Sequence, residues 1–175
     1  MTGPVVFLGD SLTYGGKWDE WFSELDARNF GIGGNKASDV LKRLDAVIEL
    51  EPSLVVLMLG TNDIGQPDLT TIDIAAGYAQ ILARLRLESS ASVIVQSAPP
   101  RQAQWAAPLR ELNNRYRSLA DAFGHGYLDV WPVFSADGVE LDGPLTTDGV
   151  HFTDEGYDRW MSVLRPMVER EISAS

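Results

Sequence analysis

The run Leu54-Val-Val-Leu-Met-Leu59 is apolar throughout and rich in branched side chains. Two further runs share this character, Val5-Val-Phe-Leu8 and Ser92-Val-Ile-Val95, and Gly, Pro, Ser or Asp residues bound all three. An unbroken apolar run of this length is typical of a strand that is buried on both faces, as in a parallel sheet. Residues 28–32 and 127–130 are weaker candidates, and they bring the predicted sheet to five strands.

Segments with helical spacing separate these strands. Apolar residues recur at helical intervals within residues 40–48, 78–85 and 109–119, while polar residues fill the other face. A last helix is expected from about Asp154, with Thr153 as its N-cap. Because strands and helices alternate, the sequence predicts a three-layer α/β/α domain with a mostly parallel sheet. Ligands of such sheets bind beyond the carboxyl ends of the strands.

Length and charge restrict the classes of protein that fit. The chain has 175 residues, so residues 1–175 are expected to form a single domain. Cysteine is absent, which excludes disulfides, thiolate metal sites and a catalytic thiol. The net charge of −11 argues against a nucleic-acid groove or a basic membrane-binding patch. No apolar run reaches the roughly 20 residues of a membrane span, and no secretory leader is visible, so a cytoplasmic protein without stable membrane association is expected.

Two motifs contain the residues for nucleophilic chemistry. Gly9-Asp-Ser-Leu12 follows the first predicted strand, where a serine can present its hydroxyl as a nucleophile, although serine there is also typical of a helix N-cap or a turn. Asp148-Gly-Val-His151 precedes the last helix, and this spacing can fold the carboxylate back onto the imidazole and fix its tautomer. The second histidine, His125, has no carboxylate at such a spacing and is interpreted as a turn residue.

Two more motifs follow the second and third predicted strands. Asn29-Phe-Gly-Ile-Gly-Gly34 can expose backbone N–H groups to an anion. Gly60-Thr-Asn-Asp63 contains an asparagine amide, which offers uncharged N–H donors to an oxyanion. Each motif is also typical of an ordinary turn. Taken together with a serine and an Asp–His pair, they are the components of acyl transfer.

In their order and wide separation, the four motifs resemble those of the SGNH hydrolases, also called the GDSL family of esterases and lipases. The resemblance implies a flavodoxin-like α/β/α sandwich with a five-stranded parallel sheet. It implies Ser11 as nucleophile, His151 as general base and then acid, and Asp148 as the carboxylate that orients the imidazole. It further implies an oxyanion hole formed by the backbone N–H groups of Ser11 and Gly34 and the side-chain amide of Asn62. No metal and no organic cofactor is implied.

The sequence departs from the family pattern at one position beside these motifs. Asn35 stands where the family often has Asp, and little consequence for the chemistry is expected.

The expected substrate is a small ester. Five βα units use almost all 175 residues, so the site is expected to be open and without a lid domain. Candidate walls are residues 12–21, 66–72 and 97–105, and the possible pocket residues among them are Trp18, Pro99 and Trp105. We expect a serine esterase acting on short-chain acyl or O-acetyl esters. The alternatives are a lysophospholipase or thioesterase of the same family and a non-catalytic flavodoxin-like binding module; the sequence does not indicate the oligomeric state.

Overall fold

The computed structural model describes residues 3–174, so Met1, Thr2 and Ser175 of the expected domain lie outside the described residues. Its sheet has five strands in the order β2-β1-β3-β4-β5, and all neighbouring strands are parallel. The predicted five-stranded parallel sheet is thus confirmed, with small differences in where the strands end. The strands are β1 (Val5–Gly9), β2 (Ala27–Gly31), β3 (Leu54–Met58), β4 (Ser92–Gln96) and β5 (Gly126–Leu128).

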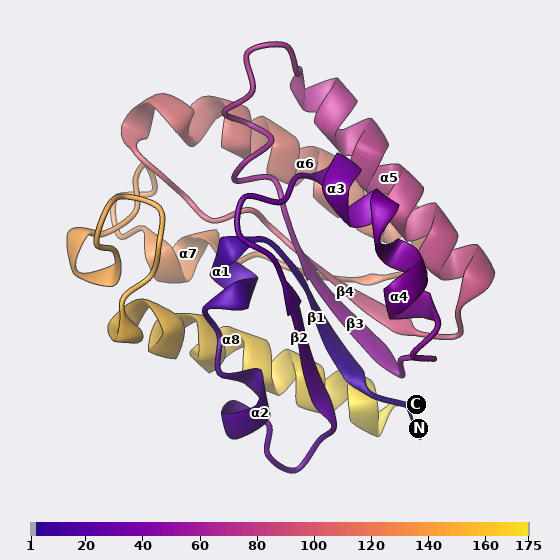
Figure 1. The fold of residues 1–175 in the computed structure, drawn as a ribbon. Coiled ribbons are helices and arrows are strands. Elements are labelled where there is room, and N and C mark those ends of the chain that lie inside the picture. The colour runs from indigo at the N-terminus through magenta and orange to yellow at the C-terminus, as the bar shows by residue number, and fades with distance from the viewer. Residues whose placement is uncertain (1–2, 175) are drawn as a thin grey trace.

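Helices cover both faces of the sheet, which confirms the flavodoxin-like three-layer arrangement (Figure 1). One face carries α3 (Ala37–Lys42), α4 (Leu44–Ile48), α5 (Thr71–Glu88) and α6 (Ala106–Phe123). The other face carries α1 (Ser11–Tyr14), α2 (Trp18–Trp21), α7 (Trp131–Phe134) and α8 (Asp154–Ser173). Two short 3₁₀ turns, Ala103–Trp105 and Gly143–Leu145, complete the elements.

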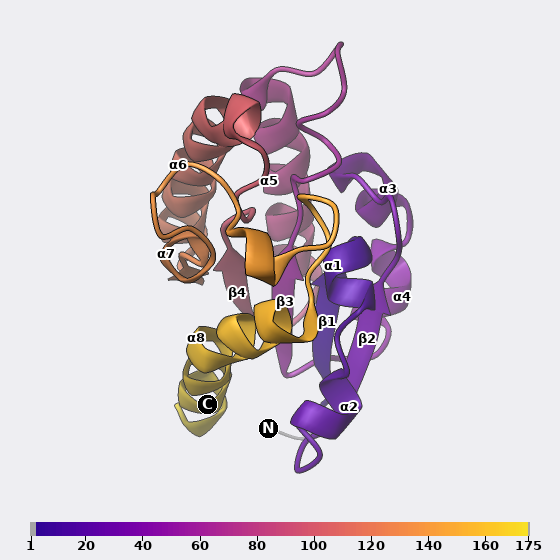
Figure 2. The ribbon, with the colours of Figure 1, turned by 90° about the vertical axis from the view of Figure 1, so that its left-hand side faces the viewer.

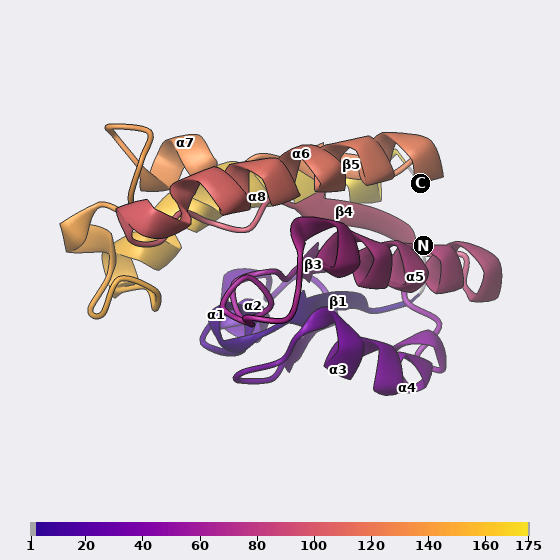
Figure 3. The same ribbon diagram turned by 90° about the horizontal axis from the view of Figure 1, so that it is seen from above.

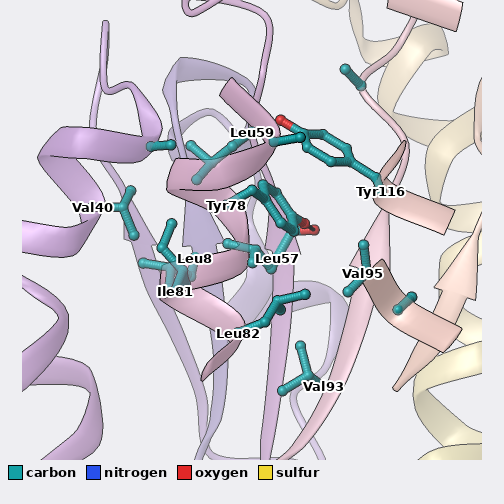
Figure 4. Packing of buried hydrophobic residues seen from close by; sticks show 14 of the residues in the cluster. Leu8, Val40, Leu57, Leu59, Tyr78, Ile81, Leu82, Val93, Val95 and Tyr116 are labelled. Carbon is teal, nitrogen blue, oxygen red and sulfur yellow. Dashed lines mark hydrogen bonds between the residues drawn. The ribbon is translucent and has the colours of Figure 1, made fainter. Parts of the chain in front are cut away.

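The central strand β3 shows why its sequence is apolar without alternation. Val55 and Leu57 face the helices of one layer, whereas Leu54, Val56 and Met58 face those of the other. On the first face the strands pack against α5 and α6, which lie side by side (Figure 3). The rings of their tyrosines, Tyr78 and Tyr116, stack at 3.9 Å in the middle of this packing (Figure 4).

Trp18 belongs to the core of the opposite face, so its prediction as a pocket residue is wrong. Its ring stacks on Phe7 at 4.1 Å and meets Trp160 edge to face at 5.2 Å. The indole N–H donates to the Thr13 carbonyl at 2.8 Å, and only 1% of the residue is exposed. The ring therefore offers no surface to a substrate.

The predicted helix over residues 40–48 is in fact two helices. They meet at Arg43, whose φ of −115° and ψ of 10° interrupt the helical path between α3 and α4. The inward face is nevertheless as expected, because Val40, Leu44 and Val47 are buried. The last helix begins as predicted, with the Thr153 hydroxyl accepting from the Gly156 N–H at 3.2 Å.

The segment between α7 and α8 positions the last motif. In Figure 2 this segment, drawn in orange, passes beside α1 at the carboxyl ends of the strands. Residues from the two ends of the chain therefore meet at one edge of the sheet. In the part of the chain that is described, no helix combines the length and apolar character needed to span a bilayer.

Candidate active site

Ser11 lies at the carboxyl end of β1, as the first residue of α1. The preceding Asp10 is the N-cap of this helix, and its Oδ1 accepts from the Leu12 N–H at 3.0 Å. The end of β2 lies directly beside the helix. A Cβ at Gly31 would lie only 2.1 Å from the Tyr14 nitrogen, so only glycine allows the α1 backbone this close to β2.

The structure joins Ser11, His151 and Asp148 in one hydrogen-bonded chain. Ser11 Oγ lies 3.0 Å from His151 Nε2, although the two residues are 140 positions apart. On the other side of the ring, His151 Nδ1 lies 2.7 Å from Asp148 Oδ2. With the ring proton on Nδ1, the imidazole donates to the carboxylate and accepts from the serine hydroxyl. This arrangement can remove the serine proton while the carboxylate stabilises the imidazolium that forms.

The loop that carries Asp148 and His151 is organised by short-range hydrogen bonds. Asp148 Oδ1 accepts from the backbone N–H groups of His151 at 2.8 Å and Val150 at 2.9 Å. The imidazole hydrogen bond, assisted by these backbone donors, lowers the pKa of Asp148 to about 2, so the carboxylate is ionised at neutral pH. Thr146, which the sequence reasoning missed, accepts from the Gly149 N–H at 2.9 Å and donates to the His151 carbonyl at 2.8 Å. Thr146 lies only two residues before Asp148 in the sequence, and this short spacing could have indicated its role in the loop.

The glycine motif forms an exposed turn beside the serine. A Cβ built at Gly33 would lie 3.9 Å from the Ser11 Cβ, which places this turn against the hydroxyl-bearing residue. The next residue, Gly34, has a φ of +75° with open space around it. Within residues 3–174, the backbone N–H groups of Ser11, Gly33 and Gly34 donate no hydrogen bond. They are therefore free to bind an oxygen that carries negative charge.

Asn62 lies in the loop that follows β3, between the glycine turn and the serine motif. Its Nδ2 donates to the Asn35 carbonyl at 3.0 Å and lies 3.5 Å from Asp10 Oδ2. The next residue, Asp63, accepts from the Ala37 N–H at 2.9 Å and so links the same loop to the start of α3. The Asn62 amide is thus fixed by one good hydrogen bond, while the longer contact leaves a second N–H that can turn to another acceptor.

Asp10 is a further residue of the site that sequence reasoning did not identify as functional. It is fully buried at the carboxyl end of β1, next to Ser11, and its Oδ2 lies 3.5 Å from Asn62 Nδ2. Burial raises the pKa of Asp10 to about 7, Asp63 adds to this effect, and the Leu12 N–H and His151 oppose it. The motif Gly9-Asp-Ser-Leu12 does not indicate the burial or the raised pKa of Asp10, because the burial depends on chain segments distant in sequence.

We expect Asp10→Asn to change how stability depends on pH. The pKa of Asp10 is about 7 in the folded chain against 3.8 unfolded, so between pH 4 and 7 the native state binds more protons than the unfolded state. The wild type should therefore lose stability as pH rises through this window, by on the order of a few kcal/mol at about 1.4 kcal/mol per pKa unit. Urea unfolding at several pH values measures the difference between the two proteins. Curves that stay parallel from pH 4 to 7 would contradict the raised pKa.

The remaining predicted pocket residues lie in the segment that follows β4. Pro99 is buried and offers no surface, whereas Trp105 is partly exposed, with the Arg101 guanidinium 5.2 Å from its ring centre. The neighbouring Gln102 donates to the Asp148 carbonyl at 3.4 Å, so this segment reaches the loop of the last motif. A cavity of about 540 Å³ lies further away between α3 and α5, and Ser11 does not line it. Among the described residues, no three Asp, Glu or His side chains are grouped as metal ligands.

Comparison with known proteins shows sequence similarity to one family. The sequence profile of the GDSL-like lipase/acylhydrolase family matches residues 7–159. Platelet-activating factor acetylhydrolase IB subunit alpha1 from Rattus norvegicus is 35% identical over 169 residues, which cover 87% of this chain and 69% of that protein.

Solved structures show the same likeness. A GDSL-like lipase from Bacteroides thetaiotaomicron is 27% identical with a TM-score of 0.83, covering 95% of this chain and 87% of the other. A catalytic mutant of an acetylxylan esterase from Geobacillus stearothermophilus is 19% identical with a TM-score of 0.80, covering 98% and 94% of the two chains, a likeness of fold alone.

Proposed function

Since this chain belongs to the GDSL-like lipase/acylhydrolase family, we propose that it is a serine esterase that hydrolyses short-chain acyl or O-acetyl esters. The observation that carries the proposal is the hydrogen-bonded chain from Ser11 through His151 to Asp148, with distances of 3.0 and 2.7 Å. Those separations suit proton transfer from the hydroxyl to the imidazole.

In the proposed first half-reaction, Ser11 Oγ attacks the carbonyl carbon of the ester while His151 Nε2 takes the hydroxyl proton. The carbonyl oxygen becomes an oxyanion in the tetrahedral intermediate. When this intermediate collapses, the bond to the alcohol oxygen breaks and His151 gives its proton to that oxygen. The acyl group remains on Ser11, and Asp148, still ionised, holds the ring in place throughout.

In the second half-reaction, water takes the place of the alcohol. His151 removes a proton from the water, whose oxygen attacks the acyl carbon and forms a second tetrahedral intermediate. Its collapse releases the carboxylic acid and returns the proton to Ser11 Oγ. The sequence of steps draws on no metal and no organic cofactor.

We assign the oxyanion hole to the backbone N–H groups of Ser11 and Gly34 and the amide of Asn62. The free backbone donors of the serine and the glycine turn support this assignment, as does the location of Asn62 between them. Three uncharged donors in a fixed place stabilise charge that develops only during the reaction.

A short acyl group is favoured by the openness of the site. About half of the side-chain surface of both His151 and Asp148 is exposed, so a long acyl chain would lie largely in water beside them. The rat relative is named an acetylhydrolase, which also favours a short acyl group. The net charge of −11 disfavours anionic esters.

We expect the rate of hydrolysis to fall with acyl length. With p-nitrophenyl esters, kcat/KM for acetate or butyrate should exceed that for decanoate by about tenfold or more, since extra methylene groups raise the rate only where a pocket covers them. Measuring the series at concentrations below micelle formation tests this. A clear preference for decanoate would instead support the lysophospholipase or thioesterase alternative.

The non-catalytic alternative makes a different prediction. A flavodoxin-like binding module would hydrolyse none of these esters, and its serine would not react with a fluorophosphonate.

The single domain over residues 1–175, the cytoplasmic location and the absence of nucleic-acid partners stay predictions of the sequence.

A further inference from the structure

Arg43 stands at the break between α3 and α4 and contacts three separate segments. Its Nη2 donates to the Gly9 carbonyl at 3.1 Å and to the Phe30 carbonyl at 2.9 Å, at the carboxyl ends of β1 and β2. Its Nε donates to Asn35 Oδ1 at 2.8 Å, just beyond the glycine turn. One planar side chain thus joins the strand that leads to Ser11 with the loop that leads away from Gly34.

The contacts continue from Asn35 to the side chain assigned to the oxyanion hole. The Asn35 carbonyl accepts the hydrogen bond from Asn62 Nδ2 at 3.0 Å, the shortest contact of that amide. Arg43 holds the side chain of Asn35, and the main chain of Asn35 holds Asn62. Asn35 therefore links the guanidinium to the Asn62 amide.

We propose that Arg43 is a positioning residue of the oxyanion hole, which acts through Asn35 to keep the Asn62 amide beside Ser11. The inference rests on the proposed esterase function and assigns a role to a residue outside its four motifs. Arginine suits the task because its planar group presents several fixed N–H donors at once, whereas a lysine ammonium would reach these acceptors less directionally.

The surroundings of Arg43 distinguish this role from an ordinary surface charge. The side chain is partly buried, and all three of its acceptors are uncharged oxygens rather than carboxylates. A salt bridge therefore does not account for its location. The helix is interrupted at Arg43 itself, although the apolar pattern on both sides fits one continuous helix. Local rules of sequence commonly fail at functional positions of this kind.

The test is a double-mutant cycle between Arg43 and Asn62 with p-nitrophenyl acetate. Asn62→Ala is expected to lower kcat by about 10²- to 10³-fold, as loss of one oxyanion donor does. Arg43→Met should lower kcat by about 10- to 100-fold with KM changed by less than about threefold, because a donor displaced by about 1 Å loses much of its effect. In the Asn62→Ala background, Arg43→Met should cost only about threefold or less, since the donor it positions is already gone.

Two further variants separate positioning from folding. Asn35→Ala removes the Arg43 acceptor while leaving the core intact, and it should lower kcat by about tenfold; Asn35→Asp keeps the acceptor and should restore most of that loss. Arg28→Met makes the same replacement at an exposed arginine of β2 that pairs with Asp26, and it should leave kcat unchanged.

A thionoester provides the second readout. Sulfur in place of the carbonyl oxygen accepts hydrogen bonds poorly, so this substrate gains little from the oxyanion hole. Arg43→Met and Asn62→Ala should both lower the ratio of ester to thionoester rates, whereas general damage to the fold would slow both substrates alike. This ratio remains informative where Arg43→Met reduces the folded fraction.

The outcomes separate the positioning role from the esterase proposal. If Asn62→Ala slows the reaction but Arg43→Met costs the same factor with and without Asn62, the positioning role is overturned while the esterase proposal stands. An unchanged ester-to-thionoester ratio in Arg43→Met overturns it as well. If the wild type hydrolyses no ester and Ser11 resists fluorophosphonate, the esterase proposal itself fails.

Discussion

Replacing Ser11 with alanine is expected to lower kcat for p-nitrophenyl acetate by about 10⁴-fold or more, because the variant lacks the hydroxyl that forms the proposed acyl-enzyme. The Ser11 hydroxyl oxygen lies 3.0 Å from His151 Nε2. The same variant should no longer react with a fluorophosphonate probe, whereas the wild type should carry the label on the peptide that contains Ser11. Kinetics and peptide mapping by mass spectrometry measure the two effects.

Ser97 offers a matched control for this substitution. It also follows a strand, but it is fully buried, accepting from the Val130 N–H at 2.9 Å and lying 3.3 Å from Asp129. Ser97→Ala should keep the label and most of the activity of the folded protein, while stability falls by about 1 kcal/mol or more. Activity that survives Ser11→Ala and disappears in Ser97→Ala would reverse the assignment of the nucleophile.

The second large effect is expected for His151→Ala, which should lower kcat by about 10⁴-fold, since the serine then has no base and the leaving alcohol no acid. KM should change little by comparison, because the imidazole acts on protons rather than on substrate binding. Steady-state kinetics across a range of acetate ester concentrations separates the two parameters.

His125→Ala is the control for this variant. His125 lies just before β5, at the opposite end of the strands from Ser11, and its ring is parallel to that of Phe123. The backbone N–H of His125 donates to the Ala120 carbonyl at 2.8 Å, so the residue belongs to the turn after α6. Most of the activity should remain in His125→Ala; an inactive His125→Ala beside an active His151→Ala would contradict the proposed base.

The sequence predicted the sheet well because burial on both faces leaves a direct mark on composition. β3 is apolar at every position, β1 and β4 are apolar apart from Gly9, Ser92 and Gln96 at their ends, and the structure contains all three where that pattern indicates. The helix over residues 40–48 was predicted less well. Its apolar face is correct, but the break falls at Arg43, whose side chain donates to carbonyls of β1 and β2, and no local pattern records these distant contacts.

The same distinction applies to the site. Asp148 and His151 are close in sequence, so their contact could be inferred from spacing, and the structure brings them to Ser11 as expected. Trp18 was misassigned because an aromatic ring beside a motif fits a pocket wall and a core equally well from sequence alone. Asp10 was missed because its burial comes from segments distant in the chain.

The distance of 140 positions between Ser11 and His151 has a consequence for protein synthesis. A ribosome makes the serine, the glycine turn and Asn62 well before the imidazole, which follows the serine by 140 residues. The Tyr157 hydroxyl then donates to the Leu12 carbonyl at 2.9 Å, which ties the late segment to the early one. Under the proposed mechanism, a nascent chain is therefore unable to hydrolyse esters until residue 151 has emerged from the exit tunnel.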